Sequence, residues 1–295
     1  MGRGAWGELS ARPVRPGRDF RPRPLRAIIP AGRDGVRGDD LERYSRQIML
    51  EELGEAGQER LGRAAVLVVG CGALGSAQLG LLCRAGVGRL RFIDPDRVEL
   101  GNLHRQLLYD ERDVAAGRPK AEAAAAHLAA VNSGVVLEPL VERAGPGNIA
   151  GLLAGMDLVL DASDDLRLRY LLNDACVRAG LPWLYGGVDG AGGMLLAVEP
   201  GRGPCLRCLW PDPPAPAGPP PVFPPAPVLV GAQQAALALR RLATGEPLPG
   251  RLLLLDAWQA SWRALQVERD PHCRCCGARR FDFLPGGKVP DAGDG

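Results

Sequence analysis

The sequence predicts an α/β fold with a metal-binding C-terminal part. Strand-like apolar runs alternate with helical segments, a glycine-rich turn joins the first strand run to a helix, and two C-x-x-C pairs occur late in the chain. A chain of 295 residues can form one large α/β domain or two small ones, and either buries a sizeable core.

The glycine-rich turn follows the apolar run of residues 66–69 and has the pattern G-x-G-x-x-G. Such a turn between a strand and a helix is typical of a Rossmann-like, nucleotide-binding βαβ unit. Gly70 allows the turn, Gly72 lets the backbone approach a phosphate, and Gly75 lets the helix pack closely on the strand. The start of the helix offers free N–H groups to an anion, so a nucleotide is the expected ligand.

A second predicted strand, residues 90–93, ends at Asp94. This position is about 20 residues after the turn, where an acidic side chain can accept hydrogen bonds from a ribose. The polar loop that follows contains Asn102 and Arg105. Ligands of open α/β sheets bind beyond the carboxyl ends of the strands, so we expect this loop at the site.

Two cations, Arg118 and Lys120, begin an alanine-rich helix that reaches about Asn132, with Pro119 suited to its first turn. Cations at a helix N-terminus oppose the macrodipole, and a bound polyphosphate would reverse the sign of that effect. Two surface cations that point into water are an equally good interpretation of these residues.

Three carboxylates, Asp161, Asp164 and Asp165, follow a predicted strand (156–160) and precede a predicted helix (166–180). One carboxylate is expected as an N-cap, but three exceed what capping needs, and Mg²⁺ ligands facing a phosphate are the sharper interpretation. A dinucleotide-dependent oxidoreductase would not need these acids and the preceding cations, whereas a triphosphate with Mg²⁺ accounts for both. The Walker pattern G-x-x-x-x-G-K-[ST] is absent, which excludes a P-loop enzyme.

The remaining segments complete the predicted α/β pattern. Two short amphipathic helices are expected within residues 41–65, a helix at 229–244, and a loop in the proline-rich segment 211–227. Further strands are predicted at residues 135–141, 182–188, 193–198, 251–255 and 262–267.

The two C-x-x-C pairs are Cys205 with Cys208 and Cys273 with Cys276. Four thiolates from two such pairs fit tetrahedral Zn²⁺, and a closed site of this kind is structural because no position is left for water or substrate. Cys275 could replace Cys276 as a ligand. Of the other cysteines, Cys83 and Cys176 are predicted to be small core residues within helices. Cys71 lies at a helix N-terminus that could lower its pKa, but an ordinary residue at a strand end is the preferred interpretation.

Composition bounds the class of protein. With 36 basic and 34 acidic residues the chain is near neutral, so charge does not favour nucleic acid, and no run suits a membrane span or a secretory signal. We expect a cytoplasmic protein with reduced cysteines. Residues 1–38 are predicted to be a disordered basic extension, 39–284 the folded domain (zinc segments near 204–209 and 272–277), and 285–295 a disordered tail.

As a set, these motifs resemble the MoeB/ThiF/HesA family of ubiquitin-activating-like adenylyltransferases. The resemblance covers about residues 41–277 and includes the glycine turn, the C-x-x-C pairs, Arg43-Tyr44-Ser45-Arg46-Gln47, Asp94-Pro95-Asp96, Asn102-Leu103-His104-Arg105-Gln106, Pro119-Lys120, residues 161–165, Leu171 to Cys176 and Leu254 to Ala257. It implies a mixed sheet with helices on both faces, a structural zinc, and a homodimer. It also implies ATP-dependent adenylation of the C-terminal glycine carboxylate of a small β-grasp sulfur carrier that ends in Gly-Gly.

The resemblance also implies roles for individual residues. The nucleotide would contact residues from several loops. The phosphates would contact Gly70, Gly72, Ala73, Gly75, Asn102, Arg105 and Lys120. Asp94 would contact the ribose, and Asp164 with Asp165 would lie at Mg²⁺. Asp164 is the implied Mg²⁺ ligand, and Arg46 would reach the nucleotide of the other subunit. Arg46, Arg105, Lys120 and Asp164 are the residues expected to carry catalysis.

Three departures from the family pattern bear on function. Ala73 replaces a usual glycine, Asp165 replaces a usual asparagine, and residues 211–227 contain no cysteine, although many relatives carry one there. We therefore expect adenylation alone, with sulfur delivered by a separate donor protein and no rhodanese-like extension, for molybdopterin- or thiamine-type sulfur incorporation. Adenylation of a peptide in a natural-product pathway and a non-catalytic scaffold are the alternatives.

Overall fold

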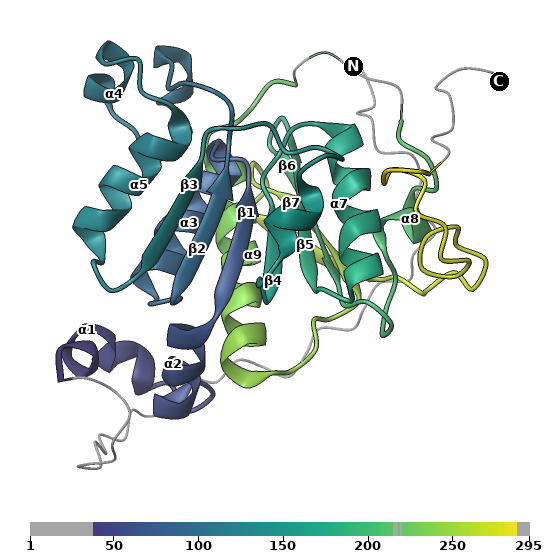
Figure 1. Cartoon of the computed structure of the whole chain (residues 1–295), viewed down its shortest axis with the longest axis horizontal. Coiled ribbons are helices and arrows are strands. Elements are labelled where there is room, and N and C mark those ends of the chain that lie inside the picture. Colours follow the sequence, from purple (N-terminus) through teal and green to yellow (C-terminus); the bar gives the residue numbers. More distant parts are fainter. Residues whose placement is uncertain (1–37, 215–217, 219, 288–295) are drawn as a thin grey trace.

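The structure, a computed structural model, describes residues 38–214, 218 and 220–287, which form one mixed β-sheet between two layers of helices (Figure 1). This arrangement confirms the predicted α/β fold with helices on both faces. The predicted basic extension, up to residue 37, and the predicted tail from residue 288 onward lie outside the described residues.

The sheet has eight strands in the described part, in the order β3-β2-β1-β4-β5-β6-β7-β8. Their bounds are β1 (Ala65–Val69), β2 (Arg89–Ile93), β3 (Val136–Leu140), β4 (Leu158–Asp161), β5 (Trp183–Asp189), β6 (Gly192–Val198), β7 (Arg251–Asp256) and β8 (Ser261–Gln266). The first five strands in this order (β3, β2, β1, β4 and β5) pair with their neighbours in parallel. The pairs β5–β6, β6–β7 and β7–β8 are antiparallel. All eight predicted strands are present, within about two residues at each end.

One face of the sheet is covered by α3 (Ala73–Arg84), α5 (Lys120–Val131) and α9 (Pro225–Thr244). Apolar residues of these helices form a single core with β1, β2 and β4, because alternate residues of each strand face this side. Leu79 and Leu82 of α3 and Leu128 of α5 are fully buried there.

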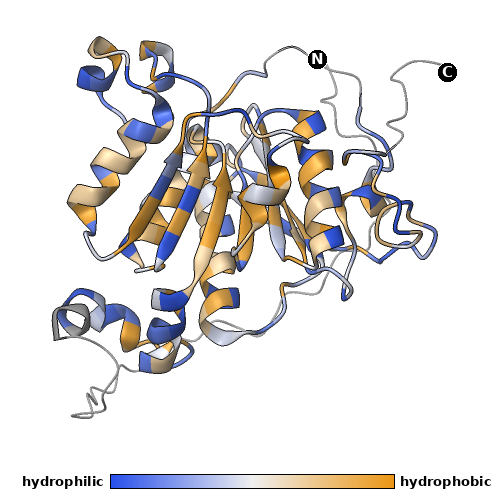
Figure 2. Ribbon diagram, viewed as in Figure 1, coloured by the Kyte–Doolittle hydropathy of each residue, from blue (hydrophilic) through white to orange (hydrophobic). Residues whose placement is uncertain are grey.

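The opposite face packs against α6 (Ile149–Leu153), α7 (Leu166–Ala179), α8 (Leu206–Leu209) and the segment around Phe283. Figure 2 shows the central strands as mainly hydrophobic, while hydrophilic residues mark the outer sides of the surrounding helices. Every residue of β1 is buried, as expected for a parallel strand covered on both faces.

The helices α1 (Gly38–Ile48) and α2 (Gly54–Arg63) lie at the end of the sheet where the parallel strands begin (Figure 1). Tyr44 of α1 accepts a hydrogen bond from Asn132, which follows α5, and contacts Gly86, which precedes β2. At the other end, η1 (Leu100–Asn102) and α4 (Glu111–Ala115) follow β2. Among the described residues, none of the helices combines the length and the apolar character needed to cross a bilayer.

The helical predictions need two corrections. Helices α4, α6 and α8, each of four or five residues, were not predicted, because such short segments show no helical periodicity. Helix α9 begins at Pro225, inside the segment predicted as a loop. Pro225 and Pro227 fall in its first turn, where the missing N–H costs no hydrogen bond, so a high proline content does not exclude helix there.

A buried ion cluster joins the C-terminal segment to α7. The guanidinium of Arg207, on α8, is fully buried, and its Nη2 donates to Asp282 at 3.0 Å while Nη1 lies 3.6 Å from Asp174 of α7. Because a buried charge is costly without a partner, each member depends on the others. Arg207 Nε also donates to Pro211 O at 3.0 Å, which fixes the chain where it leaves the C-x-x-C segment.

We predict that Arg207→Met lowers the free energy of unfolding by about 3–5 kcal/mol, because it leaves two buried carboxylates without their counter-ion. Urea denaturation would measure the change. Arg240→Met is the control, since Arg240 pairs with Glu246 at the surface and its loss should cost far less. Equal effects of the two substitutions would contradict a dominant role for the buried cluster.

Candidate nucleotide site and metal centre

The order in which the chain adds strands to the sheet switches sides at β1, because β2 pairs on one side of β1 and β4 on the other. Open α/β sheets hold their ligands at such a switch point, beyond the carboxyl ends of the strands. The turn after β1, the loop after β2, the start of α5 and the loop after β4 all meet at this edge. These four segments contain every predicted site residue except Arg46 and the cysteines.

The glycine turn has the geometry expected for close packing. Gly70 adopts φ 98°, and its N–H donates to Ile93 O at 2.9 Å. A Cβ on Gly75 would lie 2.0 Å from Gly70 O, so only glycine fits there. A Cβ on Gly72 would meet only Gln106 Nε2, at 3.8 Å, which leaves space beside the N-terminus of α3. Ala73 is the first residue of α3, and a phosphate contact at this turn stays a prediction.

Asp94, which directly follows β2, holds the glycine turn in place through hydrogen bonds to the backbone. One carboxylate oxygen accepts from Cys71 N at 2.7 Å, and the other accepts from Asp96 N at 2.8 Å. Burial raises the pKa of Asp94, and these two backbone N–H groups act in the opposite direction. Each oxygen can still accept a second hydrogen bond, so the predicted ribose contact remains compatible with this geometry.

Lys120 is held at the same edge as a buried cation. Its Nζ lies 2.9 Å from Asp96 Oδ2, its side chain is 9% exposed, and its backbone N–H donates to Asp96 O at 2.8 Å. The interpretation of Arg118 and Lys120 as two surface cations is therefore wrong for Lys120. Arg118 instead pairs with Asp113 at 3.2 Å, and the two cations do not act together.

The loop after β2 contributes a buried amide, Asn102, and a partly exposed cation, Arg105, to this edge of the sheet. Asn102 is buried, and its Oδ1 accepts from Gln106 Nε2 at 2.6 Å. Arg105 donates to Gly101 O at 2.8 Å. Leu107 N donates to Ser76 Oγ at 3.1 Å, which fastens this loop to α3. No role was predicted for Gln106, although it belongs to the same short motif as Asn102 and Arg105.

The three carboxylates at and after the end of β4 have three different environments. Asp161 is fully buried, accepts from Ser163 N and Oγ, and lies 3.3 Å from Arg169 Nε; burial raises its pKa, which Arg169 opposes. Asp165 caps α7 by accepting from the backbone N–H groups of residues 167 and 168. Asp164 is exposed and forms no hydrogen bond or ion pair with the described residues.

Only Asp164 therefore offers a free carboxylate for Mg²⁺. Mg²⁺ that accompanies phosphates usually takes one or two protein carboxylates and completes its shell with water and phosphate oxygens. A single free carboxylate at the carboxyl edge fits this pattern. Of the three carboxylates considered for Mg²⁺, Asp161 is paired with Arg169 and Asp165 caps α7, and Mg²⁺ binding by Asp164 stays a prediction.

Arg46 lies far from these residues within one protomer. It is exposed on α1, and neighbouring residues of α1 contact the ends of α5 and α3, since Arg43 donates to Val131 O at 3.0 Å and Tyr44 contacts Gly86. This is the edge where the parallel strands begin, opposite the site. A role for Arg46 in nucleotide binding thus requires a second subunit and stays a prediction.

The four predicted zinc ligands come together at the C-terminal part. The Sγ atoms of Cys205 and Cys273 lie 3.6 Å apart, those of Cys208 and Cys276 3.4 Å, and those of Cys205 and Cys208 4.0 Å. Four sulfurs at about 2.3 Å from a tetrahedral zinc would lie about 3.8 Å apart. The donor set and its spacing therefore fit a closed structural zinc site.

Cys275 belongs to a different environment. It is fully buried and its Sγ accepts from Asn173 Nδ2 at 3.2 Å, while the cluster that fits zinc contains Cys276. Cys71, Cys83 and Cys176 are buried, which confirms the core positions predicted for Cys83 and Cys176. Burial raises the pKa of Cys71 despite its place at the start of α3, so a reactive thiolate is not favoured there.

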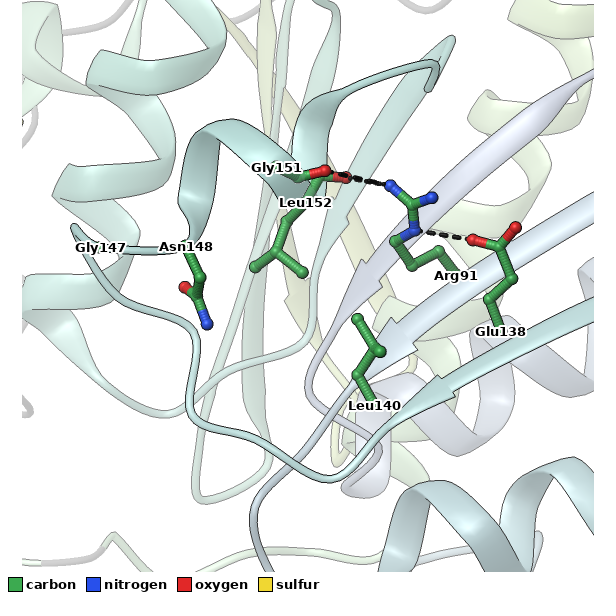
Figure 3. Close-up of a pocket in the computed structure, with 7 residues that line it drawn as sticks. All are labelled: Arg91, Glu138, Leu140, Gly147, Asn148, Gly151 and Leu152. Atoms are coloured by element: carbon green, nitrogen blue, oxygen red, sulfur yellow. Dashed lines mark hydrogen bonds and ion pairs between the residues drawn. The ribbon is translucent and has the colours of Figure 1, made fainter.

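A separate hollow lies between α6 and the end of β3 (Figure 3). It is lined by Arg91 and Glu138 of the sheet and by Leu140, Gly147, Asn148, Gly151 and Leu152. The guanidinium of Arg91 is already partnered, by Glu138 at 2.7 Å and by the carbonyl of Leu152 at 3.0 Å. The predicted site residues do not line this hollow, and we assign no ligand to it.

Comparison with known proteins identifies related chains. A family model described as the ThiF family matches residues 44–275. A sulfur carrier protein adenylyltransferase of Thermus thermophilus is 45% identical over 250 residues, which cover 81% of this chain and 92% of the relative. A SAMP-activating enzyme E1 of Haloferax volcanii is 41% identical, covering 83% and 92%. The crystal structure of E. coli MccB with ATP shares the fold, with a TM-score of 0.72, 23% identity, and coverage of 82% and 77%.

We predict that Cys276→Ser purifies with less zinc than the wild type, whereas Cys275→Ser retains about one zinc ion per chain. Mass spectrometry of the metal content would measure both, and Cys275→Ser is the matched control because the residues are adjacent. Metal should be released on acidification, since the ligands must be thiolates to bind. Loss of zinc from Cys275→Ser but not from Cys276→Ser would reverse the assignment.

Proposed function

The chain belongs to the ThiF family, and from this membership we propose that it is an ATP-dependent adenylyltransferase that activates the C-terminal glycine carboxylate of a small sulfur-carrier protein. The main support is the 45% identity to a named sulfur carrier protein adenylyltransferase, nearly all of which this chain covers. Three features at the switch point support this proposal, namely the uncrowded backbone at Gly72 beside the N-terminus of α3, the buried cation of Lys120 and the free carboxylate of Asp164.

The proposed reaction is an in-line displacement at the α-phosphorus of ATP. A carboxylate oxygen of the carrier forms a bond to phosphorus, and the bond from phosphorus to the oxygen that bridges to the β-phosphate breaks. Pyrophosphate leaves with that electron pair, and the carrier becomes an acyl-adenylate. No proton is transferred, because the nucleophile is already an anion at neutral pH.

The residues of the site would lower the barrier by placing the reactants and by neutralising charge. The N-terminus of α3, Asn102, Arg105 and Lys120 would hold the phosphates, and Asp94 the ribose. Asp164 would hold Mg²⁺, which supplies positive charge to the phosphate oxygens. Lys120 now pairs with Asp96, which is 59% exposed, so a phosphate can compete for the cation.

We further propose that the active unit is a homodimer. Leu100 and Leu107, on either side of Arg105, are 67% and 63% exposed, which is unusual for leucines beside a site and suits a surface covered by a second subunit. A dimer would also give Arg46 access to the partner's nucleotide.

We also propose that the sulfur comes from a separate donor protein, because residues 211–227 contain no cysteine that could carry it. Free buried thiols agree with the reducing cytoplasm as the compartment.

We predict that ATP–pyrophosphate exchange depends on Mg²⁺ and on a small carrier ending in Gly-Gly, and that Asp164→Ala lowers the exchange rate at least about 100-fold. Radiolabelled pyrophosphate incorporation into ATP would measure this, with each host carrier tested separately. Glu59→Ala, on α2 at the far edge, is the control that should exchange normally. Failure of the wild type with every carrier would contradict the proposed function.

We predict that Arg46→Ala and Asp164→Ala are each inactive in exchange but complement one another in a heterodimer. If Arg46 acts in the partner's site, the heterodimer contains one intact site and should show about half of the wild-type activity, by the two-fold symmetry of a dimer. Co-expression with two different tags would yield the heterodimer. An inactive heterodimer would show that Arg46 does not act across the interface.

A further inference from the structure

One buried cation at the site is not explained by contact with the nucleotide. Arg169 lies on the first turn of α7, and its guanidinium reaches back to the loop after β4. Its Nη2 donates to Ser163 O at 2.7 Å and to Gly186 O at 3.2 Å. The side chain is 12% exposed, so it is screened from any ligand bound at the edge.

The surroundings of Arg169 hold the guanidinium in one place. Nε lies 3.3 Å from Asp161 Oδ2, and neither atom has a hydrogen-bond partner within the described residues, so the pair is held by charge alone. The ring of Tyr185, on β5, lies below the guanidinium, with 5.2 Å between its centroid and Cζ. Arg169 therefore bridges the end of β4 and the middle of β5.

The contact with Ser163 O matters because this carbonyl belongs to the peptide that leads into Asp164. On one side of Asp164, Asp161 accepts from Ser163 N at 2.9 Å and Oγ at 2.6 Å. On the other side, Asp165 accepts from Arg167 N at 2.8 Å. The backbone is thus fixed before and after Asp164, while the side chain of Asp164 is free.

We propose that Arg169 is a positioning residue that acts through Asp164, by holding the Ser163 carbonyl so that the free carboxylate faces the Mg²⁺ of the bound nucleotide. This inference rests on the proposed function. A purely structural role would be confined to neutralising Asp161 and would not depend on Asp164. The two roles are separable because arginine reaches Asp161 through Nε and the Ser163 and Gly186 carbonyls through Nη2, whereas the single Nζ of a lysine keeps the charge but cannot reproduce this set of contacts.

The test is a titration of nucleotide binding with Mg²⁺, using a fluorescent, non-hydrolysable ATP analogue and no carrier. We expect Arg169→Lys to raise the Mg²⁺ concentration for half-maximal binding about tenfold, with thermal unfolding and zinc content close to the wild type. Asp164→Asn should raise it as well. In the double variant the effect of Arg169→Lys should vanish, because residues that act through one group are not additive.

Arg178→Lys, in the last turn of the same helix, is the matched control and should leave the titration unchanged. If Arg169→Lys does not fold, Tyr185→Leu serves in its place, because it removes the ring below the guanidinium and keeps the arginine. Additive effects of the Arg169 and Asp164 substitutions, or an unchanged Mg²⁺ titration, would overturn the inference. Because the titration needs no carrier, failed pyrophosphate exchange with a normal titration would count against the proposed substrate and not against Arg169.

Discussion

The site depends on one steric constraint, the close approach of the backbone after β1 to the backbone after β4. A Cβ on Gly70 would lie 2.7 Å from Ala162 O, and one on Gly75 would lie 2.0 Å from Gly70 O. Only glycine allows the turn, the following helix and the end of β4 to meet. Because they meet, the N-terminus of α3 and the loop that carries Asp164 lie side by side at the edge of the sheet where we propose that the nucleotide binds.

Around this space two buried cations are paired before any ligand binds. Lys120 is paired with Asp96 and Arg169 with Asp161, whereas Asp164 forms no hydrogen bond or ion pair with the described residues. A buried cation without a counter-ion would be costly, so these carboxylates keep the cations in place. The two pairs differ in a way that matters for function. Asp96 is exposed and can give up Lys120 to a phosphate, whereas Asp161 is fully buried and holds Arg169 permanently beside the Ser163 carbonyl.

The zinc-binding part is connected to the site through α7. Residues in the second half of α7 contact the segment that carries Cys205 and Cys208, since Asn173 accepts a hydrogen bond from Leu206 N at 2.9 Å and Asp174 lies beside Arg207. The first residue of α7, Leu166, lies two positions after Asp164, with Asp165 as the N-cap between them. Tyr170, between the two, donates to the carbonyls of Trp210 and Asp212, where the proline-rich loop starts. One helix thus links the four-cysteine cluster that fits zinc to the loop that carries the free carboxylate.

By itself the sequence determined the features whose causes are local. The strand runs, the glycine turn, the main helices and the two C-x-x-C pairs follow from periodicity, backbone freedom and ligand spacing, and the structure contains them all. Only the tertiary structure decided what depends on neighbours distant in the chain. It separated Asp161, Asp164 and Asp165 into a buried counter-ion, a free carboxylate and a helix cap, and it buried Lys120. It also excluded Cys275 from the metal cluster and brought Arg169 to the Ser163 carbonyl, because burial and pairing are set by packing that no single segment contains.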